Sequence, residues 1–134
     1  MAQVKELSIE SHERNQLIKL NDRVATFIAE SGVKEGVCYI YVPHTTAGVI
    51  INEGADPTVA SDLLETLSRL VPHQASYSHP EGNADSHIKS ALVGSSATVF
   101  VRNAAPVLGT WQSIFFCEFD GPRRRKLWLK LIDG

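Results

Sequence analysis

The sequence predicts an α+β fold with a largely antiparallel sheet, and three observations lead to this class. Short β-branched and aromatic runs outnumber the helical patterns. The two longer helical patterns lie between groups of strands, whereas a doubly wound sheet alternates single strands with helices. The chain of 134 residues suits a single domain, residues 1–134, and is too short for a (β/α)₈ barrel, which needs about 250.

The first half of the chain contains three strand patterns and two helical ones. Leu7 and Ile9 alternate with polar residues and predict a strand over 4–9. Ser11 suits the N-cap of a helix that continues to residue 31 and ends at Gly32. The apolar runs 36–43 and 47–52 predict buried strands.

The second longer helix begins at Asp56 and Pro57, an N-cap followed by the residue favoured at the first helical position. Its apolar stripe ends at Pro72, and a polar loop follows over residues 73–82. A short helix is predicted for 84–93, with Asn83 or Asp85 as its N-cap. The remaining strands are predicted at 97–102, 107–108, 111–119 and 126–132.

Composition excludes several classes of function. Thirteen Lys and Arg against fifteen Asp and Glu give a net charge of −2, so no global basic field can hold nucleic acid or an anionic membrane. Any site for a polyanion must therefore be local. Cys38 and Cys117 are expected to be buried reduced thiols. The first residues lack an apolar signal segment and no apolar run could cross a membrane, so we expect a cytoplasmic protein.

The first group of residues suited to chemistry follows two predicted strands. His44 and Thr45 come directly after the run 36–43, a position where sites are commonly built. The next strand is followed by Asn52, Glu53 and Asp56. His44 fits a hydrogen-bonded turn residue as well as it fits a site residue, and helix capping alone explains Asp56.

The second group lies on the polar loop and the short helix that follows it. His79, Glu81, Asp85 and His87 place two imidazoles and two carboxylates close together in the sequence. Divalent metals prefer such donors, although the spacing matches no standard metal motif. A capped polar loop with no ligand is the alternative interpretation.

The third group runs from Gly109 to the basic residues 123–126. The glycine suits a close approach of the backbone to a ligand or a neighbouring chain. Arginine in the basic run could clamp phosphate; alternatively the run is a solvated edge that prevents aggregation. Alternation along a strand sends Arg123 and Arg125 to one face and Arg124 to the other.

Three stretches of these groups resemble the YjbQ family, also called the secondary thiamine-phosphate synthase family. They read PHTTAGVIINEGADP, SHPEGNADSHIKSALVGSS and VLGTWQSIFFCEFDGPRRRK, and the likeness extends from about residue 36 to the end. One departure is Ala104, where the family usually has glycine. The resemblance implies a curved β-sandwich, a homotrimer, and a metal-associated polar site near a subunit interface.

The resemblance also implies which residues form the site. The family's polar positions correspond to His44, Thr45, Asn52, Glu53, Asp56, His79, Glu81, Asn83, His87, Gly109, Thr110, Trp111, Gln112 and Arg125. Among them we expect His44, His79 and His87 to bind a divalent metal, with Glu53 or Glu81 nearby. The metal would be zinc, or magnesium or manganese bound together with substrate.

The function implied is metal-assisted joining of a hydroxymethylpyrimidine diphosphate to a thiazole phosphate. In this hypothesis Arg123 or Arg125 binds the phosphates, Gln112 orients the substrate, and Trp111 offers a stacking face. A hydrolase of small phosphorylated metabolites would need a similar open metal site. A trimer that binds a metal or ligand without catalysis is the third hypothesis.

Overall fold

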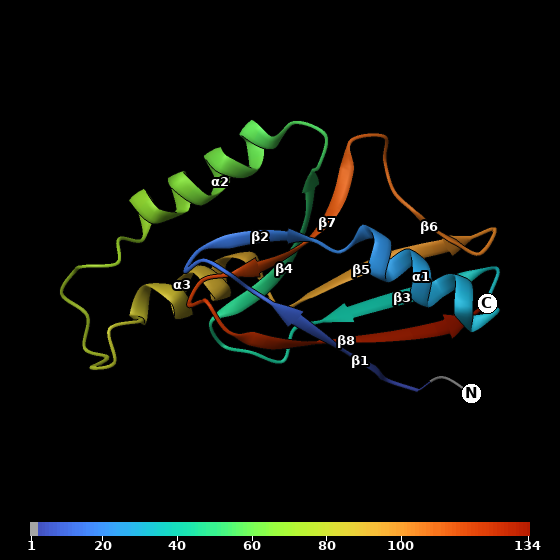
Figure 1. Ribbon diagram of the computed structural model, residues 1–134, viewed down its shortest axis with the longest axis horizontal. Helices are drawn as coiled ribbons and strands as arrows, with labels where there is room; N and C mark the ends of the chain where they lie inside the picture. The colour runs from blue at the N-terminus through green and yellow to red at the C-terminus, as the bar shows by residue number, and fades with distance from the viewer. Residues whose placement is uncertain (1–2) are drawn as a thin grey trace.

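The computed structural model describes residues 3–134, which form eight strands and three helices. Both ends of the described chain lie at one end of the molecule, and α2, α3 and the loop between them extend at the other (Figure 1). In chain order the elements are β1 (Lys5–Glu10), β2 (Gln16–Lys19), α1 (Asn21–Ser31), β3 (Gly36–Tyr41), β4 (Ala47–Glu53), α2 (Pro57–Leu70), α3 (Ala84–Val93), β5 (Ser96–Arg102), β6 (Ala105–Val107), β7 (Gln112–Glu118) and β8 (Arg124–Asp133).

The strands form two sheets in which every pairing is antiparallel. The larger sheet has the order β1-β8-β3-β5-β6, and the smaller has the order β2-β7-β4. The two sheets and α1 enclose one apolar core. The prediction of an α+β fold with a largely antiparallel, curved arrangement of strands is therefore confirmed.

Alternation along β8 places its leucines in the core. Leu127 and Leu129 are fully buried and Leu131 nearly so, whereas Lys130 and Ile132 face outward. The same alternation buries Cys38 and Ile40 on β3. Burial raises the pKa of the Cys38 thiol to about 11 and that of Cys117 to about 12, and both are free thiols as predicted.

The predicted helix over 11–31 is wrong in its first half. The helix comprises Asn21–Ser31, and residues 16–19 form β2, which pairs with β7. Ser11 caps no helix: it is buried, and its hydroxyl donates to Oε1 of Glu118 at 2.8 Å. Pairing with a strand distant in sequence thus overrides a local helical pattern, as tertiary contacts commonly do.

The other predicted elements are present with small shifts of their ends. Asp56 caps α2, since its Oδ1 accepts from the backbone N–H of Thr58 at 3.0 Å. Asn83 occupies the N-cap position of α3 but makes no capping bond. No helix within residues 3–134 is long and apolar enough to cross a membrane.

A buried ion pair joins the two sheets at one end of the core. Arg125 on β8 donates through Nε to Oε1 of Glu118 on β7 at 2.8 Å, and its Nη2 contacts the second carboxylate oxygen and the Thr46 hydroxyl. Burial alone would raise the pKa of Glu118. Hydrogen bonds from Arg125, the Asp120 amide and Ser11 outweigh that effect and lower it. The carboxylate therefore stays charged inside the protein.

Replacing one partner of this pair should strongly destabilise the fold. Arg125→Met leaves the buried Glu118 carboxylate without its counter-ion, and we expect a loss of about 3–5 kcal/mol of unfolding free energy. Urea denaturation followed by circular dichroism measures it. Arg124→Met is the matched control, because Arg124 is exposed and pairs with Glu10 at the surface; it should cost less than about 1 kcal/mol. Equal losses in the two variants would contradict this role of the pair.

The turn between β5 and β6 requires an unusual backbone conformation at Ala104. Asn103 and Ala104 have φ angles of 53° and 60°, the left-handed values of a two-residue hairpin turn. The preference for glycine that the resemblance implies here has this physical reason, because a Cβ atom costs roughly 1–2 kcal/mol in this region.

Ala104→Gly should therefore stabilise the protein, by about 0.5–1 kcal/mol after the greater entropy of glycine in the unfolded chain is included. The control is Ala29→Gly, the same change at an exposed position inside α1, which should destabilise by about 1 kcal/mol. Chemical denaturation measures the change in unfolding free energy of each variant. Destabilisation by Ala104→Gly would contradict the strain at this turn.

Candidate functional site

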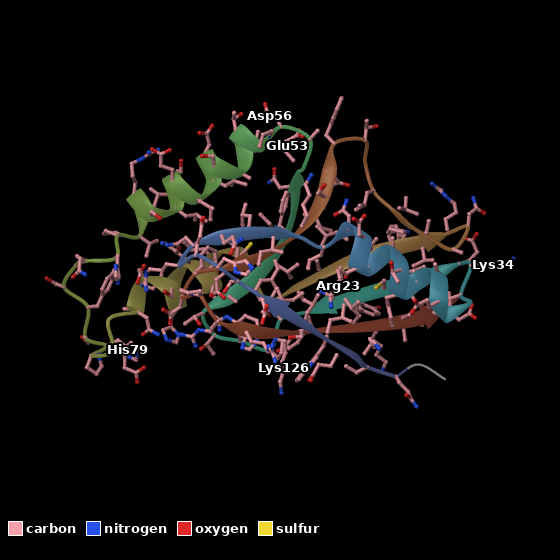
Figure 2. The ribbon with its side chains drawn as sticks, in the orientation of Figure 1. Arg23, Lys34, Glu53, Asp56, His79 and Lys126 are labelled. Atoms are coloured by element: carbon pink, nitrogen blue, oxygen red, sulfur yellow. The ribbon has the colours of Figure 1, made fainter. Side chains whose placement is uncertain are left out.

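Two of the predicted metal ligands lie side by side. His79 on the loop before α3 and His87 on the first turns of α3 have ring centroids 5.2 Å apart in an edge-to-face arrangement. Oε2 of Glu81 is 3.9 Å from Nε2 of His79. We call these three residues the histidine cluster. Figure 2 shows His79 at the far end of the loop that joins α2 to α3.

Two recesses meet at His87. One has a volume of about 300 Å³ and is lined by His79, Ala84, His87 and Ile88. The other has a volume of about 370 Å³, and its lining includes Thr45, His87 and Ser95. Small-molecule pockets begin at about this size. A larger recess of about 480 Å³ between β1 and α1 is lined by none of the predicted site residues.

A buried charged network holds α3 in place beneath the histidine cluster. Arg14 donates to Asp85 at 2.9 Å and to Asp120 at 3.2 Å. Nζ of Lys89 lies 3.5 Å from Oδ2 of Asp85 and donates to Asn15 and Ser68. Burial lowers the pKa of Lys89, and the Asp85 carboxylate opposes that shift. Asp85 and Lys89 share one buried helix face at i,i+4, so His87 points away from it into the recesses.

Sequence reasoning missed this network. Two signals were available. Asp85 and Lys89 have the spacing of a helical ion pair, and the charged residues Glu118 and Asp120 flank Phe119 directly after the apolar run 114–117. A charge inside an apolar run usually indicates a buried partner elsewhere in the chain.

His44 lies at the same end of the molecule, but its ring is already engaged. Its Nε2 accepts the backbone N–H of Lys126 at 2.8 Å, so the proton of the neutral ring is on Nδ1. Burial lowers the pKa of His44, and the positive charge of Arg125 lowers it further. The lone pair that a metal would need on Nε2 is therefore occupied by a main-chain hydrogen bond.

The two arginines predicted to bind phosphate differ in their surroundings. Arg125 is 3% exposed and is held by Glu118 and Thr46. Arg123 has a half-exposed side chain, and its guanidinium bonds to Asp120 through both the carboxylate and the main-chain carbonyl. Asn83 donates through Nδ2 to Oδ2 of Asp120 at 2.8 Å, the same carboxylate oxygen that Arg123 contacts. Of the two, Arg123 alone has a surface position from which a ligand can be contacted.

The remaining predicted residues gather at the opposite end of β4 and β7. Oε2 of Glu53 accepts the backbone N–H groups of Ala55 and Asp56 at 2.7 and 3.1 Å. The carboxylate thus organises the connection to α2. Oδ1 of Asn52 accepts the backbone N–H of its neighbour Glu53 at 2.7 Å. These residues lie beside the turn 108–112, which we call the tryptophan turn.

Hydrogen bonds fix the shape of the tryptophan turn. The amide of Gly109 donates to Oε1 of Gln112 at 2.8 Å, and the amide of Gln112 returns a bond to the carbonyl of Gly109 at 3.1 Å. The carbonyl of Trp111 accepts from Gly54 at 2.9 Å. A Cβ at position 54 would lie 1.8 Å from the Ser113 hydroxyl, so only glycine permits this contact. Thr110 and Trp111 are exposed at the tip.

The predicted site residues therefore form two separate groups within one chain. Thr45 precedes β4 and Glu53 ends it, and the strand pairs residue by residue with β7 so that Ala47 faces Glu118 and Glu53 faces Gln112. A strand of seven residues spans about 20 Å. In Figure 2, His79 lies in a different part of the molecule from Glu53 and Asp56. No small substrate can contact both groups of one chain.

The donor set of the histidine cluster suits one side of a metal centre. Two imidazoles and a carboxylate are ligands that zinc prefers. Within residues 3–134, however, no three His, Cys, Asp or Glu side chains converge closely enough to hold an ion. His79 and His87 are the pair that can bind together, and a further donor would have to come from substrate, water or another chain.

The state of His44 can be tested directly. We expect a neutral ring with the proton on Nδ1 at pH 6.5, where an unperturbed histidine is about half protonated, because burial and Arg125 lower its pKa. The unfolded state then binds more protons than the folded state just below pH 6.5, so this group reduces stability as the pH falls. Long-range ¹⁵N–¹H correlation spectra measure tautomer and titration, with His44→Gln for assignment. Half protonation at or above pH 6.5 would contradict the hydrogen-bonding scheme.

Sequence and structure comparisons give the family. The profile of the family described as UPF0047 protein YjbQ-like matches residues 5–134. A UPF0047 protein of Methanocaldococcus jannaschii is 51% identical over 124 residues, which cover 92% of this chain and 90% of that protein. YugU of Bacillus subtilis is 44% identical, with 96% and 98% covered.

Solved structures agree with this assignment. A YjbQ/UPF0047 family protein of Clostridium acetobutylicum superposes with a TM-score of 0.93 at 44% identity, covering 96% of this chain and 99% of that one. A protein of Sulfolobus solfataricus, described as being of unknown function, gives 0.94 at 28% identity, covering 100% and 99%. The chain therefore belongs to the YjbQ/UPF0047 family.

Proposed function

We propose that the protein is a transferase that forms thiamine phosphate, or a closely similar product, at the histidine cluster. The observation that carries this proposal is the edge-to-face pair of His79 and His87 where two recesses meet. The choice of reaction rests on the resemblance to the secondary thiamine-phosphate synthase family. A reaction between two phosphorylated heterocycles requires polar ligands, positive charge and an aromatic surface, and the two groups of residues offer all three.

In this reaction the thiazole nitrogen bonds to the methylene carbon of the pyrimidine substrate, and the bond from that carbon to the diphosphate breaks. Pyrophosphate leaves with the electron pair, so positive charge develops on the pyrimidine. A divalent cation held by His79 and His87 would neutralise the leaving group. Arg123 is the protein group placed to bind phosphate at this end, and the Thr45 hydroxyl lines the adjoining recess.

The developing pyrimidine cation is stabilised by an aromatic face, which Trp111 provides in this proposal. Because Trp111 lies about 20 Å away along β4 and β7 in its own chain, the proposed active assembly is an oligomer, a homotrimer in the simplest case. Its sites lie near the contacts between protomers. Gln112 and Glu53 accompany Trp111 in this arrangement.

The test is coupling by the purified protein. Hydroxymethylpyrimidine diphosphate and thiazole phosphate are incubated with zinc, magnesium or manganese, and thiamine phosphate is quantified after oxidation to its fluorescent thiochrome. We expect product that chelator abolishes. His87→Ala should lower turnover at least about tenfold, because even the residues that only support a metal ligand cost about that much when they are replaced. His12→Ala is the matched control, an exposed histidine that lines neither recess.

Two outcomes would overturn the proposal. Unchanged turnover in His87→Ala would remove the histidine cluster from the reaction. No coupling with any of the three metals, together with release of inorganic phosphate from phosphate esters, would assign the site to hydrolysis instead.

A further inference from the structure

The larger sheet has an open edge at β1. This strand is the end strand of the sheet and pairs with β8 alone. The backbone N–H of Ser11, directly after β1, donates to the carbonyl of Arg123 at 3.0 Å, so the odd-numbered residues are the ones that bond to β8. Alternation then directs the N–H and C=O groups of Glu6, Ser8 and Glu10 away from the sheet. Within residues 3–134 no acceptor bonds to these three N–H groups.

One contact shows which element lies beside this edge. Nη1 of Arg23 on α1 donates to the carbonyl of Ser8 at 3.2 Å. This arginine, labelled in Figure 2, reaches from the helix to the strand. The open edge therefore runs alongside α1, and exposed edge strands are templates for pairing with another extended chain.

Two recesses lie between β1 and α1. The larger is the recess of about 480 Å³ described above, and its apolar lining includes Val33 and Leu131. The smaller has a volume of about 300 Å³ and is lined by Leu7 and by side chains of α1. Lys5 and Phe27 line both, so the recesses are continuous, and we call them together the β1 groove.

The β1 groove has the spacing of a strand. Lys5 and Leu7 are successive residues on one face of β1, so the two recesses follow each other along the strand as side chains on one face do. A strand added to this edge would direct every second side chain toward α1, at intervals of about 7 Å. Phe27 is half-buried and supplies apolar surface to both recesses. Apolar side chains at two alternate positions of the added strand therefore fit the groove.

The opposite face of β1 is acidic. Glu10 pairs with Arg124 of β8 through Oε1, and Glu6 pairs with Lys126 through Oε2. The second oxygen of each carboxylate has no partner within the described part of the chain. Opposite charges in directly facing strand positions stabilise a sheet, and like charges destabilise it. Basic residues are therefore favoured there, whereas the β1 strand of a second copy would place glutamate or serine opposite.

We propose that the β1 groove binds an extended peptide segment of a partner protein, in which apolar residues alternate with basic ones, as an added antiparallel strand. Its main chain bonds to Glu6, Ser8 and Glu10, its apolar side chains fill the two recesses, and its basic side chains face the two glutamates. None of the predicted site residues lines the groove, so the inference goes beyond the proposed function and does not depend on it. The six residues of β1 offer about 20 Å of contact, which suits a transient interaction.

A synthetic hexapeptide, acetyl-KVTLKL-amide, is the probe. Paired antiparallel to β1, its lysines face Glu10 and Glu6, and its two leucines face Leu7 and Lys5. The matched control is acetyl-EVTLEL-amide, which keeps the apolar pattern and reverses the charge. Isothermal titration calorimetry should show binding of the first peptide at least about tenfold tighter than that of the second.

Amide hydrogen exchange followed by NMR locates the bound peptide. The lysine peptide should slow the exchange of Glu6, Ser8 and Glu10, whose N–H groups gain acceptors. It should leave the odd-numbered residues of β1 unchanged, because they are already bonded to β8. Protection of the even-numbered amides before peptide is added would show that a second copy covers the edge, and would overturn the inference.

Two variants test the groups that the proposal uses. Ser8→Pro removes an outward N–H without removing a bond to β8, a position where edge strands accept proline; it should abolish peptide binding, whereas Ser8→Ala keeps the N–H and should bind like the wild type. The double variant Glu6→Lys and Glu10→Lys changes exposed residues alone and should reverse the preference, so that the glutamate peptide binds more tightly. No binding of the lysine peptide by the wild type, equal binding of the two peptides, or an unchanged preference in the double variant would each overturn the inference.

Discussion

The buried pair of Glu118 and Arg125 is the interaction on which the arrangement of the site depends. It joins β7 of the smaller sheet to β8 of the larger, and it also binds Ser11 and Thr46. Residues from four segments therefore meet around one carboxylate. Because this end of the two sheets is fixed, His44 and Thr45 leave β3 in a defined direction, and α3 can pack against β4 with His87 facing the recesses. The charged network of Arg14, Asp85 and Lys89 completes the support from the other side of α3.

Much of the fold could be predicted because its local signals agree with its tertiary contacts. The alternation of Leu127, Leu129 and Leu131 predicts a half-buried strand, and Asp56 with Pro57 predicts the start of α2. The failure at residues 11–20 has a clear cause. Ser11 has the character of a helix cap, but its hydroxyl serves Glu118, which is 107 positions away in the sequence. Pairing of this segment with β7 cannot be detected from a local pattern.

The sequence predicts which residues belong to the candidate site, but not how they are arranged in space. His79 and His87 are close in sequence, and the loop and helix between them bring their rings together. Arg125 belongs to a basic run that suggests phosphate binding, yet alternation along β8 places its side chain inside the protein. The separation of Glu53 and Trp111 from the histidine cluster follows from the register of β4 with β7, which sequence alone does not define. This register is the reason that the two groups of predicted site residues lie apart in one chain.

Mixing two complementary variants measures most directly whether one site is built from two copies. In the proposed homotrimer with shared sites, His87→Ala removes the recess side of each site and Trp111→Ala removes the tip side, so each variant alone should lose most of its turnover. After the two are dissociated and reassembled together, about a quarter of the interfaces combine an intact recess with an intact tip, and that share of wild-type turnover should return. Mixed oligomers that native mass spectrometry detects, but that regain no activity, would contradict a shared site.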